Sequence, residues 1–195
     1  DDKGAGLITH QADSLINIAL PADGVYYLYV GDAQKKGGLE YAYRLRLSPP
    51  QPDYELRLAP SSISARGGAI IPITVFALRR DGFDGDIAVS IKEGPAGFAL
   101  AGATIPAGQD RVRMTLACTA PPHRAPIDLA FEGRSKIGGQ EAVRPAVPAD
   151  DMMQAFAYRH LVAAQELKAV ISSGGGGRMA QILDKQPMRL VSGGE

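Results

Sequence analysis

Three aspartates surround two glycines in the stretch RRDGFDGDIAV, residues 79–89, and carboxylates at such close spacing can ligate a cation. A calcium loop of the EF-hand type needs acidic oxygens at alternate positions and a glutamate at the twelfth position. The aspartates here are Asp81, Asp84 and Asp86, and the twelfth position from Asp81 is Lys92. Glycines at this spacing favour positive φ angles in a hairpin loop. The sequence therefore predicts a turn between two strands and no metal site.

Four further carboxylates, those of Asp1, Asp2, Asp13 and Asp32, are alternative ligands for a structural calcium ion. Chain ends and turns also favour aspartate for reasons of backbone geometry and solubility. The sequence leaves both interpretations of these residues open.

Imidazole bases are limited to His10, His123 and His160. His10 is close to Asp13 and Ser14 in sequence, but the groups of a catalytic triad converge from separate elements. The chain has neither a G-x-S-x-G nucleophile elbow nor an H-E-x-x-H zinc motif. An enzyme would need a pocket in which His10 or His160 meets a carboxylate, so the sequence predicts a protein that is not an enzyme and has no cofactor.

The single cysteine, Cys118, excludes an intrachain disulfide and a cysteine-based metal cluster. It falls on the apolar row of an alternating segment, where a lone thiol behaves as a small apolar side chain. The GGGG run at residues 174–177 lacks the Lys-Ser/Thr ending of a phosphate-binding loop, and we predict a flexible loop there.

The composition of the 195-residue chain argues against two classes of partner. Its 21 basic and 21 acidic side chains give a formal net charge of zero, whereas nucleic-acid binders carry a basic field. No apolar run approaches the roughly 18 residues of a membrane span. We expect neither nucleic-acid binding nor membrane insertion. The first residues, DDKGAG, resemble neither an initiator Met nor a signal segment, and we expect a processed form or a piece of a longer protein.

Residues 15–20, 25–30 and 41–47 alternate apolar and polar side chains with turn residues between them, which predicts a three-stranded meander. The more apolar rows are expected to meet in a core. These rows are Tyr26, Leu28 and Val30 in the second strand and Tyr41, Tyr43, Leu45 and Leu47 in the third.

The opposite face of this meander carries Tyr27 and Tyr29 beside Arg44 and Arg46. Guanidinium groups that stack on phenol rings contribute roughly 0.5–1 kcal/mol at exposed sites, so this face can be purely structural. The same four side chains are the one candidate ligand platform, although the absence of Trp weakens a carbohydrate-binding interpretation.

Three prolines in SPPQPD, residues 48–53, interrupt any strand ladder and predict a linker. A second series of alternating segments follows at a spacing of about 8 to 15 residues, which is typical of a seven-stranded sandwich. These segments are residues 54–58, 69–78, 86–91, 98–102, 111–119, 126–133 and 136–147.

The last part of the chain is ambiguous. Apolar side chains near helical spacing, with Asp151 and Gln154 as a capping pair, predict a short helix or turn over residues 151–158. Residues 166–171, ELKAVI, also fit a strand, so the C-terminal part is expected to be a short helix or a further β segment.

The N-terminal segment resembles the closing strands of the bacterial pre-peptidase C-terminal domain, a jelly-roll-like β-sandwich of secreted proteins that is often appended to peptidases. The resemblance rests on Gly24 and Tyr26 in DGVYYLYV and on Tyr43, Leu45 and Leu47 in YAYRLRL, and it covers about the first 48 residues. The earlier strands of that family are missing from this chain.

Residues 66–100, RGGAIIPITVFALRRDGFDGDIAVSIKEGPAGFAL, are similar to immunoglobulin-like repeats of large bacterial surface or secreted proteins, in which an R-x-D-G-F-x-G-x-I stretch joins two strands. This resemblance implies a fold and an extracellular setting, but no reaction.

Together these observations predict an all-β protein with a partial jelly-roll-like unit at residues 1–50, an immunoglobulin-like sandwich at 51–148 and an extension at 149–195. One interpretation of this extension is the start of another β domain. We expect a non-enzymatic spacer, accessory or adhesion module of a secreted, periplasmic or cell-surface bacterial protein. The alternative is a glycan- or protein-binding module that targets a linked peptidase. Expected partners are other domains of a parent chain, and an exposed sheet edge would allow a homodimer.

Overall fold

The computed structural model describes residues 16, 18–32, 34–154 and 158–173 of the chain. All regular secondary structure in this part is β, and no helix occurs in it. This confirms the all-β class. The strands are β1 (Asp53–Ala59), β2 (Ser62–Arg66), β3 (Ala69–Arg80), β4 (Ile87–Lys92), β5 (Phe98–Ala101), β6 (Thr104–Ile105), β7 (Arg111–Cys118), β8 (His123–Asp128), β9 (Ala130–Ile137), β10 (Gln140–Gln154), β11 (Tyr158–Ala163) and β12 (Lys168–Ser172).

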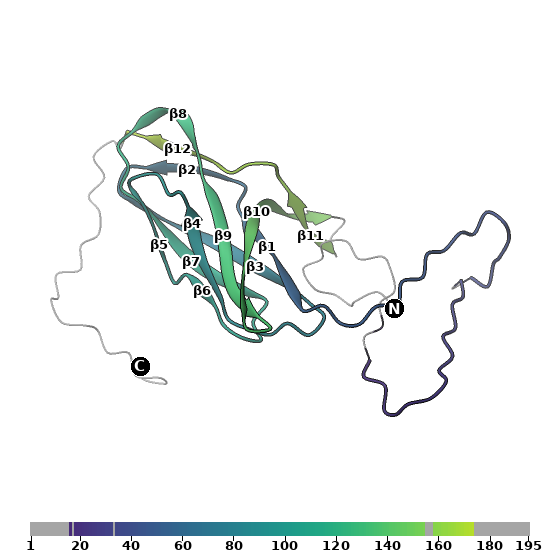
Figure 1. The fold of residues 1–195 in the computed structure, drawn as a ribbon. Helices are drawn as coiled ribbons and strands as arrows, with labels where there is room; N and C mark the ends of the chain where they lie inside the picture. Colours follow the sequence, from purple (N-terminus) through teal and green to yellow (C-terminus); the bar gives the residue numbers. More distant parts are fainter. Residues whose placement is uncertain (1–15, 17, 33, 155–157, 174–195) are drawn as a thin grey trace, which may run out of the picture.

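The larger sheet has the strand order β5-β7-β3-β1-β10-β9-β4-β6, with β11 paired to the far part of β10. Its neighbours are antiparallel except for β1 and β10, which run parallel. The sheet curls until its two ends approach each other, as Figure 1 shows for β4 and β5. The smaller sheet, β2-β12-β8, covers one end of this curled sheet.

The described part of the chain crosses between the two sheets five times, and two of these crossings have defined features. The chain passes from β1 to β2 at Pro60, where the missing proline N–H cannot continue the ladder. It passes from β8 to β9 at Leu129, whose N–H donates to the carbonyl of Leu167 at 3.0 Å. These two crossings connect the sheets into one β-sandwich-like body.

The core follows the predicted period of two. Inward-facing side chains of β4, β7 and β9 are buried and their sequence neighbours face solvent, because successive strand residues point to opposite faces. Side chains that are fully buried and large are those of Tyr54, Leu56, Leu58, Ile73, Val75, Ile87, Ile105, Met114, Leu116, Cys118, Leu167 and Ile171.

The predicted N-terminal strands do not form. Within the described residues before Asp53 the chain has turns and bends but no strand. An extended segment becomes a strand only when a neighbour completes its ladder, and none of the described strands pairs with residues 16–52. The local pattern was therefore insufficient to create the sheet.

The helix or turn expected over residues 151–158 is also wrong for the residues described. β10 continues as a strand through Gln154, across the expected boundary at residue 148, and its second half pairs with β11 from Ala149↔Ala163 to Gln154↔Tyr158. This ladder outweighs the helical spacing of the apolar side chains, since tertiary pairing overrides local propensity. β11 and β12 are the further β segment that was the alternative expectation for this part of the chain.

Candidate binding surface

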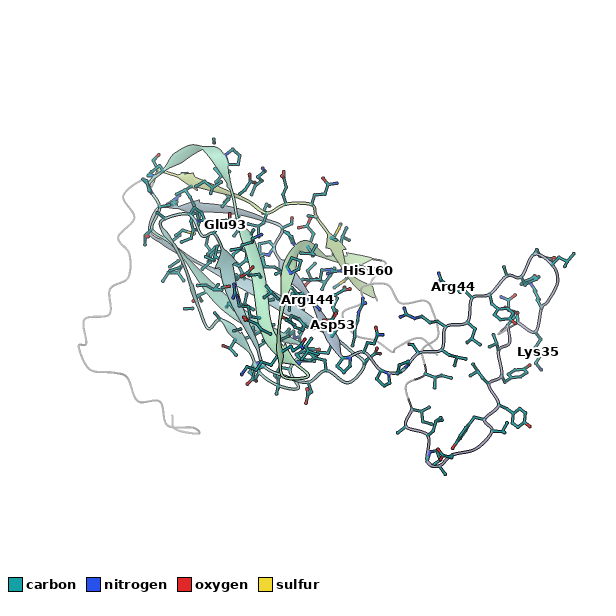
Figure 2. All side chains as sticks on the ribbon, in the orientation of Figure 1. Lys35, Arg44, Asp53, Glu93, Arg144 and His160 are labelled. Carbon is teal, nitrogen blue, oxygen red and sulfur yellow. The ribbon has the colours of Figure 1, made fainter. Side chains whose placement is uncertain are left out.

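The proposed platform lies on the N-terminal segment, away from the β body (Figure 2). Tyr27 and Tyr29 expose 95% and 92% of their surface, and Arg44 and Arg46 are also exposed. All four side chains are therefore accessible to a ligand. The strands that would have aligned them are not formed, so the expected stacking of arginine on tyrosine stays a prediction.

Side-chain hydrogen bonds stabilise two turns in the described part of this segment. The Tyr26 hydroxyl donates to the carbonyl of Ala22 at 2.5 Å and accepts the N–H of Ala22 at 3.3 Å. These two contacts close the PADG turn. The Asp32 carboxylate accepts the N–H groups of Gln34 and Lys36 at 2.8 and 3.0 Å. Asp32 thus stabilises a turn. Asp1, Asp2 and Asp13 lie outside the described residues.

Arg79 organises the aspartate-rich loop of residues 81–86. Its guanidinium donates to the carbonyls of Gln109, Gly85 and Pro106 at 2.9, 2.7 and 2.9 Å. The same group lies 5.2 Å from the ring centroid of Phe83. One arginine therefore ties this loop to the loop that follows β6.

Two of the three aspartates of this loop, Asp81 and Asp86, bind backbone groups, which agrees with the predicted turn. Asp81 and Gly82 have φ angles of 48° and 82°. The Asp81 carboxylate accepts the N–H of Gln51 at 2.9 Å, and that of Asp86 accepts the N–H of Ala107 at 2.6 Å. Within the described residues, no group of three or more His, Cys, Asp or Glu side chains has a geometry that could hold a metal ion.

The other sequence candidates are dispersed. His160 lies on β11 opposite Met152, His123 lies on β8, and His10 and the glycine run at 174–177 lie outside the described residues. Cys118 is fully buried, and burial raises the pKa of its thiol. A protonated, enclosed thiol is a poor nucleophile, in agreement with its predicted place on the inner row.

Two open grooves, which the sequence analysis missed, lie on the β body. The first has a volume of about 420 Å³. The second, of about 520 Å³, lies over β4 and β9 and carries the ion pair between Arg134 and Glu132, whose atoms are 2.7 Å apart. No signal in a single strand could have revealed them, because their walls come from strands far apart in sequence. The first is lined by Ala59, Pro60, Pro72, Thr74, Arg113, Asp150 and Asp151, and the second by Ala88, Ser90, Ile91, Lys92, Glu93, Glu132 and Arg134.

The chain enters and leaves the β body at opposite ends (Figure 1). At the entry, the guanidinium of Arg144 contacts the carboxylate of Asp53 at 3.1 and 3.2 Å. At the exit, the N–H of Gly67, directly after β2, donates to the carbonyl of Ser172 at 3.3 Å. The entry and exit therefore lie at opposite ends of the path that β1 and β2 follow through the body.

In comparisons with known proteins, no family model matches the chain, and no curated protein matches it significantly. The described part contains no helix long and apolar enough to cross a membrane. The fold and the geometry of these surfaces therefore carry the functional argument.

Proposed function

We propose that the chain is a non-enzymatic accessory module of a larger secreted or cell-surface bacterial protein, and that its β body is a spacer between the segments before Asp53 and after Ser172. We also propose an immunoglobulin-like arrangement for residues 51–148 and a jelly-roll-like one for residues 1–50. Stacked, mainly antiparallel sheets support the immunoglobulin-like arrangement. The resemblance of residues 20–50 to a secreted bacterial domain supports the jelly-roll-like arrangement and the secreted or cell-surface location.

The observation that carries the spacer function is the position of the two chain ends of the body. Residues 53–66 of β1 and β2 are extended, and at about 3.3 Å per residue they span up to about 40 Å. Because β12 runs parallel to β2, with Arg66 opposite Ser172, the exit lies at the far end of this span. A body of this kind keeps its neighbours apart without a long flexible linker.

The polar groups of the body support a structural role. Arg79 binds three loop carbonyls, Asp86 binds a loop N–H, and the hydroxyl of Tyr54 lies 2.8 Å from two carbonyls inside the sandwich. These contacts fix loops and strands to one another. They are the contacts that a module needs to keep its length.

Ligand binding is the second candidate, and the near-complete exposure of Tyr27 and Tyr29 favours it. Exposed tyrosines supply large, rigid contact area for glycan or protein, and Arg44 and Arg46 add hydrogen-bond donors. In this function the segment would target a linked peptidase to its substrate.

A distance measurement tests the spacer function. The full chain carries Cys118→Ala, so that the only cysteines are those introduced by Gln51→Cys and Ser173→Cys. Fluorophores are attached to these two cysteines, and energy transfer between them is recorded on single molecules. We expect a separation that approaches the upper limit of about 40 Å and is clearly longer than that of the control pair. The control pair, Gln51→Cys with Gln140→Cys, marks the same end of the body and should lie within about 25 Å. Equal separations for the two pairs would contradict the spacer function.

A separate assay tests ligand binding. The full chain is applied to a glycan array and to immobilised bacterial envelope proteins, with the double variant Tyr27→Ala, Tyr29→Ala alongside. Saturable binding by the unmodified chain would support this function if the affinity of the double variant is at least tenfold lower. Ile70→Ala, which removes an exposed apolar side chain of the body, is the matched control and should bind as the unmodified chain does.

A further inference from the structure

Apolar side chains gather on the N-terminal segment to an extent that an isolated extended chain cannot sustain in water. Fourteen large hydrophobic residues of residues 16–47 are exposed, whereas those of the β body are mostly buried. Each exposed side chain of this size forgoes roughly 1.5–3 kcal/mol of burial. Exposed apolar surface on this scale is typical of an interaction site.

The two rows of residues 25–30 already differ in exposure. Tyr26, Leu28 and Val30 are 46–50% exposed. The side chains of the other row, Val25, Tyr27 and Tyr29, are 82–95% exposed. Tyr41 and Leu45, in the returning segment, are also only 45% and 50% exposed, whereas Tyr43 and Leu47 of the same predicted row are 76% and 80% exposed. The half-covered side chains all belong to the rows predicted to face a core, and within residues 25–30 they form one face.

The turn before this row has the geometry of a sandwich corner. In β-sandwiches a tyrosine near the start of a strand bonds through its hydroxyl to the backbone a few residues upstream, at the corner where the chain changes sheets. Tyr26 makes this contact with Ala22, four residues upstream. This hydrogen bond fixes the turn that precedes residues 25–30, as the corresponding bond does in a sandwich.

We propose that this apolar face is a homodimer interface, in which residues 16–47 of two copies pack face to face and complete one sandwich. The interface is isologous, with each copy presenting the same row of Tyr26, Leu28 and Val30 and the facing row of residues 41–47. Tyr27 and Tyr29 stay on the outer surface of the dimer. The inference goes beyond the spacer function and does not depend on it.

The size and charge of the face fit a second copy. Seven side chains at roughly 100 Å² each give about 700 Å² per copy, close to the ~800 Å² per partner of a standard specific interface. Residues 16–48 carry four basic and three acidic side chains, a net charge of +1, so self-association meets little repulsion. Packing a surface against itself closes a two-fold dimer and leaves no copy of this face free for further addition.

The body of the same chain does not cover this face. The linker is held at Gln51, whose N–H donates to Asp81, and from there the segment extends away from the sheets (Figures 1 and 2). A second copy can therefore approach the apolar row without displacing the body.

Sedimentation velocity of the full chain between 1 and 200 µM tests the proposal. We expect a concentration-dependent dimer, whose dissociation constant rises at least tenfold in the inner-row variant Tyr43→Ser, Leu45→Ser. The matched outer-row variant Tyr27→Ser, Tyr29→Ser should change it less than threefold. Unchanged thermal unfolding of the body in both variants shows that the substitutions act on the interface.

Three outcomes would overturn the proposal: a monomer throughout this concentration range, equal weakening by both variants, or a dimer that neither variant weakens. A monomer would indicate that another macromolecule or additional chain covers the face. The single-molecule separation between residues 51 and 173 is recorded at nanomolar concentration, where the chain is monomeric, so failure of the dimer and failure of the spacer function are distinguishable.

Discussion

The hydroxyl of Tyr54 on β1 lies 2.8 Å from the carbonyl oxygen of Gly133 on β9, a strand that β10 separates from β1 in the sheet. The same hydroxyl lies 2.8 Å from the carbonyl of Ala142 on β10. The Tyr54 ring stacks on Phe83 with 5.1 Å between centroids. One side chain thus joins three strands and the aspartate-rich loop at the entry end of the body.

Gly133 is required for this packing. A Cβ at this position would be closer to the side chains of Leu56 and Ile87 than real Cβ atoms come to their neighbours. We expect Gly133→Ala to lower the free energy of unfolding by about 1–3 kcal/mol, because an added methyl group in a packed core forces its neighbours to move. Gly67→Ala is the control, since its Cβ would make only an ordinary 3.5 Å contact, and denaturant unfolding of both variants checks the prediction.

The phenol of Tyr54 predicts an alkaline limit of stability. Burial raises the pKa of Tyr54 above its ordinary value of 10.0, because the buried site disfavours the phenolate. The unfolded state therefore loses this proton first. The contribution of Tyr54 to stability is fully present below pH 10 and is lost as the pH rises through the folded-state pKa. Tyr54→Phe should lower stability at pH 7 by about 1–2 kcal/mol and flatten this alkaline decline. Equal slopes for both proteins in unfolding experiments at pH 8–11 would show that Tyr54 is not the titrating group.

The pair of Asp53 and Arg144 predicts the opposite dependence at low pH. Partial burial alone would raise the pKa of Asp53, but hydrogen bonds from Arg144 and from the Tyr54 N–H, with the charges of Arg144 and Arg80, lower it below 3.8. The contribution of the ionised Asp53 to stability is present above pH 3.8 and is lost as the pH falls through the lowered folded-state pKa. Asp53→Asn should cost about 1 kcal/mol or less at pH 7, because the pair is partly exposed. The cost should vanish near pH 2, and a cost independent of pH would contradict the ion pair.

Cys118 should be inert while the body is folded. Its thiol is fully buried and its pKa is raised by burial, so few thiolates are present at neutral pH and none is accessible. We expect iodoacetamide at pH 7.5 to leave native Cys118 unmodified for hours and to alkylate it completely in denaturant. Rapid alkylation of the native protein, followed by mass spectrometry, would place this thiol on the surface.

Local patterns were sufficient where a strand has a buried face. The inner row of β7 with Met114, Leu116 and Cys118 could be predicted because burial on one face forces a period of two. The turn at Asp81 and Gly82 was also predictable, since residues with positive φ belong to short loops.

Long-range relationships could not be predicted in this way. The contact of Asp53 with Arg144 joins residues 91 positions apart, and the helical spacing after Asp151 gave no sign of the ladder between β10 and β11. The strand pattern around Tyr27 was clear, yet it needed a pairing partner that lies outside the described strands. Pairing is a property of the whole sheet and is weakly encoded in any one segment.

The spacer function depends most on residues 168–172, because β12 between β2 and β8 places the exit of the chain at the far end of the body. Amide hydrogen exchange of the full chain measures this directly. The slowest amides of residues 168–172 should exchange as slowly as those of residues 54–58, through global unfolding of the body. Exchange at residues 168–172 as fast as in the linker at residues 48–52, with residues 54–58 still protected, would contradict the structure and the spacer function together.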